Sequence, residues 1–148
     1  YKRQMDAAGF NLDTWKNLAL TYKHLEHLID AFMPRTRRNN TYCKTLSGVS
    51  DERIKSVRTI DGLREVFNND RYHKVNFEAY SRHRTVEFRQ HSGTTNFTKM
   101  ENWIRFLNGL ITFAKRSSLP SRMTLEGLPF LDGKQKLFFK LRTKKLAV

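Results

Sequence analysis

The stretch Arg84-Thr85-Val86-Glu87-Phe88-Arg89-Gln90-His91 decides the fold, because apolar and polar side chains alternate along it. Strict alternation is the period of a half-buried strand, in which successive side chains point to opposite faces of a sheet. Val86 and Phe88 are therefore expected to face a core. The polar residues on the opposite face are Thr85, Glu87, Arg89 and His91. The sequence thus places a carboxylate two residues from a guanidinium on one exposed sheet face.

That pair of groups suggests a site. Glu87 can bind a hard cation such as Mg²⁺ through oxygen, and Arg89 can clamp a carboxylate or a phosphate with its planar fork of donors. These are components of a phosphoryl-transfer or acyl-phosphate site. The alternative is a structural ion pair on a solvated sheet, because such pairs resemble functional ones. The residues alone leave both interpretations open.

Around this strand the sequence predicts an α+β fold in a single domain, residues 1–148, with a small antiparallel sheet packed by several helices. Residues 84–91 are expected to pair with residues 74–80 through a hairpin at 81–83. The apolar residues from Trp15 to Phe32 recur at helical spacing, with Asn11 or Asp13 as N-cap and Pro34 as the stop signal. Shorter helices are predicted at 50–57 and 59–67, a turn at 68–70, a single turn at 124–128 and a last helix after Asp132.

Another long helix is predicted after residues 93–96. Its apolar stripe consists of Phe97, Met100, Ile104, Leu107, Ile111 and Ala114, widened by Trp103 and Leu110. This stripe is typical of a helix face buried in a core rather than of a cofactor site. The last helix is expected to carry Leu137, Phe138 and Leu141. In the first helix, His24 and His27 flank Glu26 on a polar face, so they are interpreted as solvated side chains rather than as metal ligands.

The chain has 28 Lys and Arg against 14 Asp and Glu, a formal charge of +14. Such an excess favours polyanionic partners, although each cluster can also be a solubilising surface. The basic residues form three clusters: Arg35, Arg37, Arg38 and Lys44; Arg71, His73, Lys74, Arg82, Arg84 and Arg89; and Lys134, Lys136, Lys140, Arg142, Lys144 and Lys145.

The chain has one cysteine, Cys43, which excludes an internal disulfide and is compatible with a reducing compartment. Cys43 is interpreted as a small loop residue. No apolar run approaches the ~20 residues of a membrane span, and no signal peptide is visible. These features predict a soluble cytoplasmic protein without a membrane partner.

Several motifs together resemble the C-terminal half of the phage and bacterial amidoligase family, which is related to the glutamine synthetase and glutamate-cysteine ligase superfamily. The most specific motif is Thr85-Val86-Glu87-Phe88-Arg89-Gln90-His91-Ser92-Gly93-Thr94, and the others are Arg71-Tyr72-x-x-x-Asn76, Asn102-Trp103-Ile104-Arg105-Phe106 and the stretch 33–44. The similarity extends from about Leu18 to Ala114. It implies a protein of a bacterial or phage-infected cell.

The resemblance implies ATP-dependent formation of an amide through an acyl phosphate, with ATP and Mg²⁺ as cofactors and a small or peptide-like carboxylate and amine as substrates. By position in the motif, Glu87 would be the metal ligand and Arg89 would stabilise the transferring phosphoryl group or bind the substrate carboxylate. Arg71 and Asn76 would line the nucleotide or substrate side of the sheet. Further binding residues would be Arg35, Arg37 and Arg38, from a loop that approaches the same cavity, and His91, which would support the strand residues.

One departure from the family stands out. Its members begin with a strand bearing a Gly-x-Glu-x-Glu-type acidic motif, whereas this chain is expected to pass almost directly from Tyr1 into a helix. The residues are therefore expected to be either the C-terminal portion of a longer ligase or a shortened member. The second possibility favours a non-catalytic basic protein that binds nucleic acid or a host nucleoprotein machine, as a phage-type inhibitor would.

Overall fold

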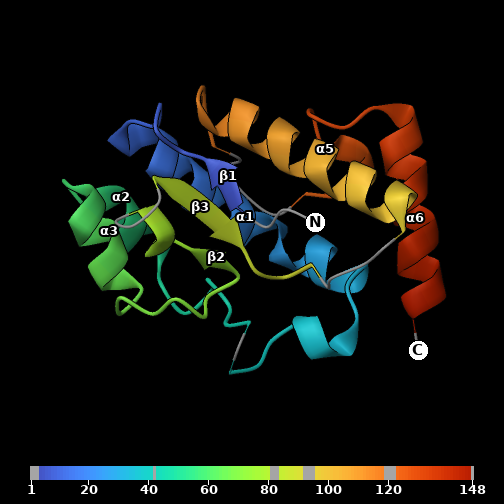
Figure 1. The fold of residues 1–148 in the computed structure, drawn as a ribbon, viewed down its shortest axis with the longest axis horizontal. Helices are drawn as coiled ribbons and strands as arrows, with labels where there is room; N and C mark the ends of the chain where they lie inside the picture. The colour runs from blue at the N-terminus through green and yellow to red at the C-terminus, as the bar shows by residue number, and fades with distance from the viewer. Residues whose placement is uncertain (1–3, 42, 81–83, 92–95, 119–122, 148) are drawn as a thin grey trace.

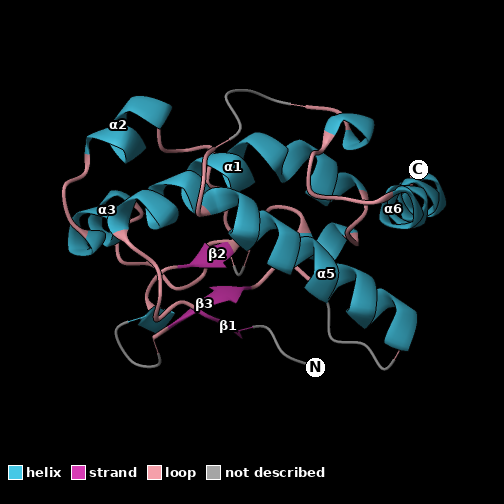
Figure 2. Ribbon diagram, turned by 90° about the horizontal axis from the view of Figure 1, so that it is seen from above, coloured by secondary structure: helices cyan, strands magenta, loops and turns pink. Residues whose placement is uncertain are grey.

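The computed structural model of the chain describes residues 4–41, 43–80, 84–91, 96–118 and 123–147. The helices and strands are β1 (Gln4–Asp6), α1 (Leu12–Ala31), η1 (Arg35–Arg37), α2 (Asp51–Ser56), α3 (Ile60–Val66), β2 (Val75–Asn76), β3 (Thr85–Phe88), α5 (Phe97–Ala114), η2 (Leu125–Gly127) and α6 (Gly133–Leu146) (Figure 1). The sheet covers one side of α1, with α2 and α3 at one end and α5 and α6 at the other (Figure 2). The predicted α+β class is confirmed.

The sheet has the strand order β1-β3-β2, and both pairs are antiparallel. Its strands are shorter than predicted, because residues 74–80 contribute only Val75–Asn76 and residues 84–91 only Thr85–Phe88. The Asn76 side chain accepts a hydrogen bond from Glu78 N at 2.9 Å, and this local turn ends β2. The hairpin predicted at residues 81–83 lies outside the described residues.

A third strand, β1, was not predicted, and the expectation that the chain passes almost directly into a helix was wrong. Gln4 pairs with Glu87, and Asp6 pairs with Thr85. With strands on both sides, β3 is the central strand of the sheet. The backbone of Glu87 is therefore held from two directions.

Local signals fixed most helix boundaries as predicted. The Asn11 side chain caps α1 by accepting a hydrogen bond from Thr14 N at 2.8 Å. Ser50 and Thr59 cap α2 and α3 in the same way, and Asp132 forms a capping box with Gln135 at the start of α6. In the described part of the chain, no helix is long and apolar enough to cross a bilayer.

The buried face of α5 differs in part from the predicted stripe. Phe97 is 70% exposed and Ile104 is only partly covered, whereas Trp103, Phe106 and Leu107 are buried. Phe106 was not in the predicted stripe. Its ring stacks on the Trp103 ring, with centroids 5.4 Å apart, so the buried face of α5 includes an aromatic contact beside the predicted apolar stripe.

The predicted last helix is α6, and it carries Leu137, Phe138 and Leu141 as expected. Leu137 and Leu141 are exposed, and Phe139 supplies the buried anchor instead. The Phe139 ring lies 4.4 Å from the ring of Phe32 at the end of α1. Apart from Gln135 and Phe139, the residues of α6 are exposed or half-buried.

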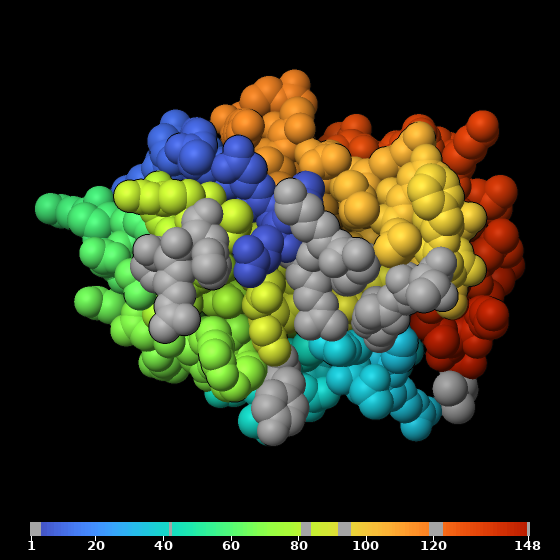
Figure 3. Space-filling model, in the orientation of Figure 1, coloured from blue at the N-terminus to red at the C-terminus, as the bar shows by residue number. Residues whose placement is uncertain are grey.

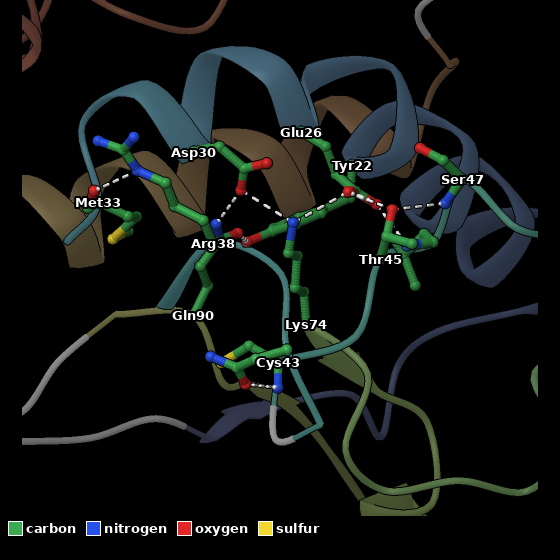
Figure 4. Close-up of polar contacts among 12 residues, drawn as sticks. Tyr22, Glu26, Asp30, Met33, Arg38, Cys43, Thr45, Ser47, Lys74 and Gln90 are labelled. Carbon is green, nitrogen blue, oxygen red and sulfur yellow. Dashed lines mark hydrogen bonds and ion pairs between the residues drawn. The ribbon is translucent and has the colours of Figure 1, made fainter. Parts of the chain in front are cut away.

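A buried lysine joins α1 to the sheet (Figure 4). The Lys74 side chain is 0% exposed, and its Nζ lies 3.0 Å from Glu26 Oε2 and 2.8 Å from Asp30 Oδ1. Gln90 donates to the same oxygen of Asp30 and accepts a hydrogen bond from Tyr22 Oη at 2.7 Å. One buried ammonium is therefore paired with two carboxylates of the same helix.

Glu26 was expected on a polar helix face, but it is buried. Besides Lys74, it accepts hydrogen bonds from Thr45 Oγ1, at 2.6 Å, and from Leu46 N. His24 and His27, its neighbours on α1, bond Asp51 and the carbonyl oxygen of Met123. The described residues contain no cluster of three metal-ligating side chains, so these histidines form no metal centre within them.

We predict that Leu107→Ala lowers the free energy of unfolding by about 2–5 kcal/mol, because a fully buried leucine is truncated in a packed core. Ile104→Ala is the matched control on the same helix, and it should cost less because Ile104 is only partly covered. Urea unfolding followed by circular dichroism measures both values. Equal losses for the two variants would contradict the orientation of α5.

The pairing of α2 with α1 gives a pH prediction. Asp51 accepts a hydrogen bond from Lys23 at 2.6 Å, and this bond, followed by His24, lowers the pKa of Asp51 below 3.8 against the opposing effect of burial. Folding thus lowers the pKa, so Asp51 stabilises the fold above its unfolded pKa of ~3.9 and loses this effect as the pH falls through the folded value. Asp51→Asn should lower Tm at pH 7, and the difference from the parent should shrink below about pH 4. A difference that stays constant down to acid pH would refute the assignment.

Candidate functional site

A cavity of about 560 Å³ opens on the face of the sheet that points away from α1. Figure 3 shows the surface where its walls meet, with the N-terminal strand in blue, β3 in yellow-green and the segment around β2 in light green. Four of the residues predicted for the site line it: Arg71, Asn76, Glu87 and Arg89. The other lining residues are Gln4, Arg64, Asn69, Tyr72, Glu78 and Ala79. Apart from Ala79, these additional residues bring charged or hydrogen-bonding groups.

Glu87 and Arg89 form the centre of the cavity. Arg89 Nη1 donates to Glu87 Oε1 at 2.9 Å, and the two side chains are only 17% and 16% exposed. Asn76 pairs with Glu87 across the sheet, and its amide nitrogen donates to the same oxygen at 3.2 Å. Glu87 and Arg89 therefore form the ion pair that the alternative, structural interpretation expects. The pair lies in the wall of a cavity, however, and not on a flat, solvated surface.

Tyr72 lies between the two predicted arginines. Its hydroxyl oxygen accepts a hydrogen bond from Arg71 Nη2 at 2.7 Å, and this bond is the main cause that raises the pKa of Arg71 above its usual value. The guanidinium carbons of Arg71 and Arg89 lie 4.9 Å and 5.2 Å from the centre of the Tyr72 ring. Both distances are typical of cation–π contacts. One aromatic side chain thus contacts both cations.

Tyr72 itself is held by the backbone. Its N–H donates to Asp70 Oδ1 at 2.8 Å, and its carbonyl oxygen accepts from Lys44 N at 2.8 Å. Burial alone raises the pKa of Asp70, but the hydrogen bonds from Lys44 and from Tyr72 N outweigh it, so that the pKa is lowered. Asp70 therefore remains a charged anchor for this turn.

A second carboxylate lines the opposite wall. Glu78 accepts two hydrogen bonds from Arg64, at 2.5 Å from Nε and 3.1 Å from Nη2. This bidentate pair is the main cause that raises the pKa of Arg64, against the effect of burial. Neither residue was predicted for the site. Arg64 lies in α3 and Glu78 was expected inside the strand at 74–80, and nothing in the sequence indicated that the two side chains would meet. For Tyr72 a signal existed in the Arg-Tyr motif, but its role was not assigned.

The other predicted residues do not line this cavity. Arg37 Nη1 donates to the carbonyl oxygen of Arg89 at 3.2 Å, and Arg38 Nε donates to that of Met33 at 2.9 Å. Arg35 lies in η1 and is exposed. The His91 ring stacks on Trp103, with centroids 5.2 Å apart, because β3 ends at Phe88 and the alternation stops before His91. Of these four residues, Arg37 comes nearest to the site, through the backbone of Arg89.

The carboxylate oxygens of the cavity would bind a metal ion only together with oxygen atoms from a bound substrate. Mg²⁺ commonly binds one or two carboxylates together with substrate phosphates. Glu87 and Glu78 supply two, each already paired with an arginine, and the described residues contain no group of three metal-ligating side chains. At the position beside Glu87 on β1 stands the amide of Gln4. Glu87 and Glu78 are the carboxylates of the cavity that could contribute oxygen ligands to a cation.

A family model described as "putative amidoligase enzyme" matches residues 4–111, well over half of the chain. The chain belongs to the amidoligase family. No curated protein and no solved structure gives a significant match. The described residues that line the cavity all fall within the part matched to the amidoligase model, whereas η2 and α6 lie outside it.

Proposed function

We propose that this amidoligase joins a carboxylate to an amine at the expense of ATP, through an acyl phosphate. The observation that carries the proposal is the convergence of Arg71, Asn76, Glu87 and Arg89, predicted from separate motifs, on one cavity. The family match supports the ligase class. Kinship to glutamine synthetase, and the view that the chain corresponds to the C-terminal part of the ligase fold, are parts of the same proposal.

The reaction has two steps. A carboxylate oxygen of the substrate attacks the γ-phosphorus of ATP, so that an acyl phosphate forms and ADP leaves. The nitrogen of the amine then attacks the acyl carbon, phosphate leaves with the electron pair of the broken C–O bond, and the amine releases one proton. Charge on the phosphoryl oxygens must be compensated during the first step, so catalysis depends largely on well-placed cations.

The residues of the cavity can provide that compensation. Arg89, held by Glu87 and by the face of Tyr72, would stabilise the transferring phosphoryl group, and Arg71 would bind the nucleotide or the substrate carboxylate. Because Arg89 and Arg71 share one ring, their positions are preorganised before any ligand binds. Asn76 keeps Glu87 in place from the neighbouring strand.

The amidoligase family implies Mg²⁺, which neutralises phosphate charge when it is bound; Glu87 and Glu78 are the residues that would hold it. The expected substrates are a small or peptide-like carboxylate and an amine, and the expected location is the cytoplasm. The family match does not favour the alternative of a nucleic-acid-binding protein.

Hydroxylamine provides a test that needs no knowledge of the natural amine. It attacks an acyl phosphate to give a hydroxamate, so the protein should form hydroxamate from ATP and a pool of carboxylic acids and amino acids. Glu87→Gln keeps the size of the side chain but removes the charge that orients Arg89. This substitution should lower the rate by about 10²-fold or more, as losses of positioned electrostatic groups commonly do.

Glu101→Gln is the matched control, because Glu101 pairs with Arg105 on the surface of α5, outside the cavity. Its rate should equal that of the parent, and the Tm of both variants should remain within a few degrees of the parent value. A Glu87→Gln protein with the parental rate would remove Glu87 from the site. Absence of hydroxamate from every acid in the presence of Mg²⁺ and ATP would count against the ligase reaction.

A second prediction concerns Tyr72. Tyr72→Phe keeps the ring for Arg89 but loses the hydrogen bond to Arg71, whereas Tyr72→Leu loses both contacts. Affinity for a non-hydrolysable ATP analogue should therefore fall in the order parent, Phe variant, Leu variant, with about a fivefold or greater loss at the last step, in line with a cation–π contact of ~1 kcal/mol. Isothermal titration calorimetry measures the three affinities. A Leu variant that binds as well as the Phe variant would show that the ring does not position Arg89.

A further inference from the structure

A second, different cavity lies between the end of α1, which the amidoligase model matches, and η2 and α6, which lie beyond the matched residues. It has a volume of about 370 Å³, opens to the surface, and is lined by the end of α1, by η2 and by α6. Its apolar lining comes from Leu28, Ala31, Phe32 and Leu125, and Lys140 and Lys144 also line it. None of these residues contributes to the cavity at the sheet, so the proposed ligase reaction does not explain this second cavity.

The floor of the cavity is formed by a residue that is packed into the core. Phe32 is buried, and its ring packs against the rings of Phe139, Phe106 and Trp103, at centroid distances of 4.4, 6.0 and 6.3 Å. At one edge, His27 Nε2 contacts the carbonyl oxygen of Met123 at 3.1 Å and so ties the segment before η2 to α1. The apolar floor thus belongs to the core and does not depend on surface side chains.

The rim carries a net positive charge, because Lys140 and Lys144 line the cavity together with one carboxylate, Glu126. Lys140 and Lys144 are one helical turn apart on α6, so their side chains project from the same face. Lys140 lies 3.9 Å from Glu126, and because the two side chains are 56% and 67% exposed, this pair contributes little. Lys144 has no ion-pair partner within the described residues. The six basic residues of α6, with no acidic residue in the helix, add to the positive potential.

We propose that this cavity binds a long-chain carboxylate, with its acyl chain over Phe32 and between Leu28 and Leu125 and its carboxylate at Lys140 and Lys144. Small-molecule sites are concave and mostly apolar, with a few polar groups that fix the orientation. The volume lies near the lower end of their ~300–1,000 Å³ range, which suits one acyl chain better than a folded partner. Charge complementarity selects an anionic head group. The inference is independent of the proposed ligase reaction.

The test uses laurate and dodecanol, which share the acyl chain but differ in charge. Each is titrated into the protein against a fluorescent fatty acid, 11-(dansylamino)undecanoic acid. In Lys140→Gln/Lys144→Gln, two charge-assisted contacts are removed while helix propensity is retained, so laurate should bind about tenfold more weakly or worse, with dodecanol little changed. Ala31→Phe should fill the cavity and abolish binding of both ligands.

Lys134→Gln/Lys145→Gln is the matched control, because it removes the same charge from the same helix at residues that do not line the cavity. It should bind laurate like the parent. A parallel titration with vesicles of anionic phospholipid separates a free carboxylate from a membrane surface. The proposal is overturned if the parent does not bind laurate, if both double variants lose affinity equally, or if only the vesicles bind. Thermal melts of each variant verify that the fold is retained, and Ala31→Val replaces Ala31→Phe if the larger side chain prevents folding.

Discussion

The buried ammonium of Lys74 constrains the whole arrangement. Removing a charge from water costs several kcal/mol per ion, and the cost is offset only when the geometry of the partners is good. Here Glu26 and Asp30 both lie within 3.0 Å of Nζ, and both come from α1, one helical turn apart. A shift of α1 along the sheet would leave three buried or half-buried charges without partners. The network therefore adds a directional constraint on the position of the helix against the strands to the constraint from apolar packing.

The segments around Lys74 and Arg89 contribute side chains to both features. Lys74 belongs to the buried ion network, and Arg89 lines the cavity. Arg89 N donates to the carbonyl oxygen of Lys74 at 2.8 Å, so the residue that reaches into the core and the residue that reaches into the cavity share a hydrogen bond. Gln90, next in the chain, turns back to Asp30. The carbonyl oxygen of Arg89 is contacted by Arg37 and by Cys43 Sγ at 3.6 Å. A backbone hydrogen bond thus connects Arg89 to the residue that carries the buried ammonium, although none of the buried ions lines the cavity.

The sequence was sufficient to predict those features that depend on neighbouring residues. Caps at Asn11, Ser50, Thr59 and Asp132 act within three residues, and the alternation around Glu87 needs only a neighbouring strand. The sequence was insufficient to predict contacts between residues that lie far apart in the chain. Pairing of Gln4 with Glu87 joins residues 83 positions apart, and Lys74 appeared only as one member of a basic cluster until Glu26 and Asp30 met it. Glu78 and Arg64 were missed for the same reason.

The net charge of +14 combines two physically different parts. In the family-matched part, the arginines of the cavity are each held in place: Arg64 by Glu78, Arg89 by Glu87, and Arg71 by the Tyr72 hydroxyl. Such preorganised cations suit one small anion of defined shape, because little entropy is lost when it binds. On α6, the single carboxylate contact found among the described residues is the long one between Lys140 and Glu126. Flexible, hydrated lysines of this kind attract anions less selectively. Selectivity at that second surface must therefore come from the apolar cavity beside them and not from the charge.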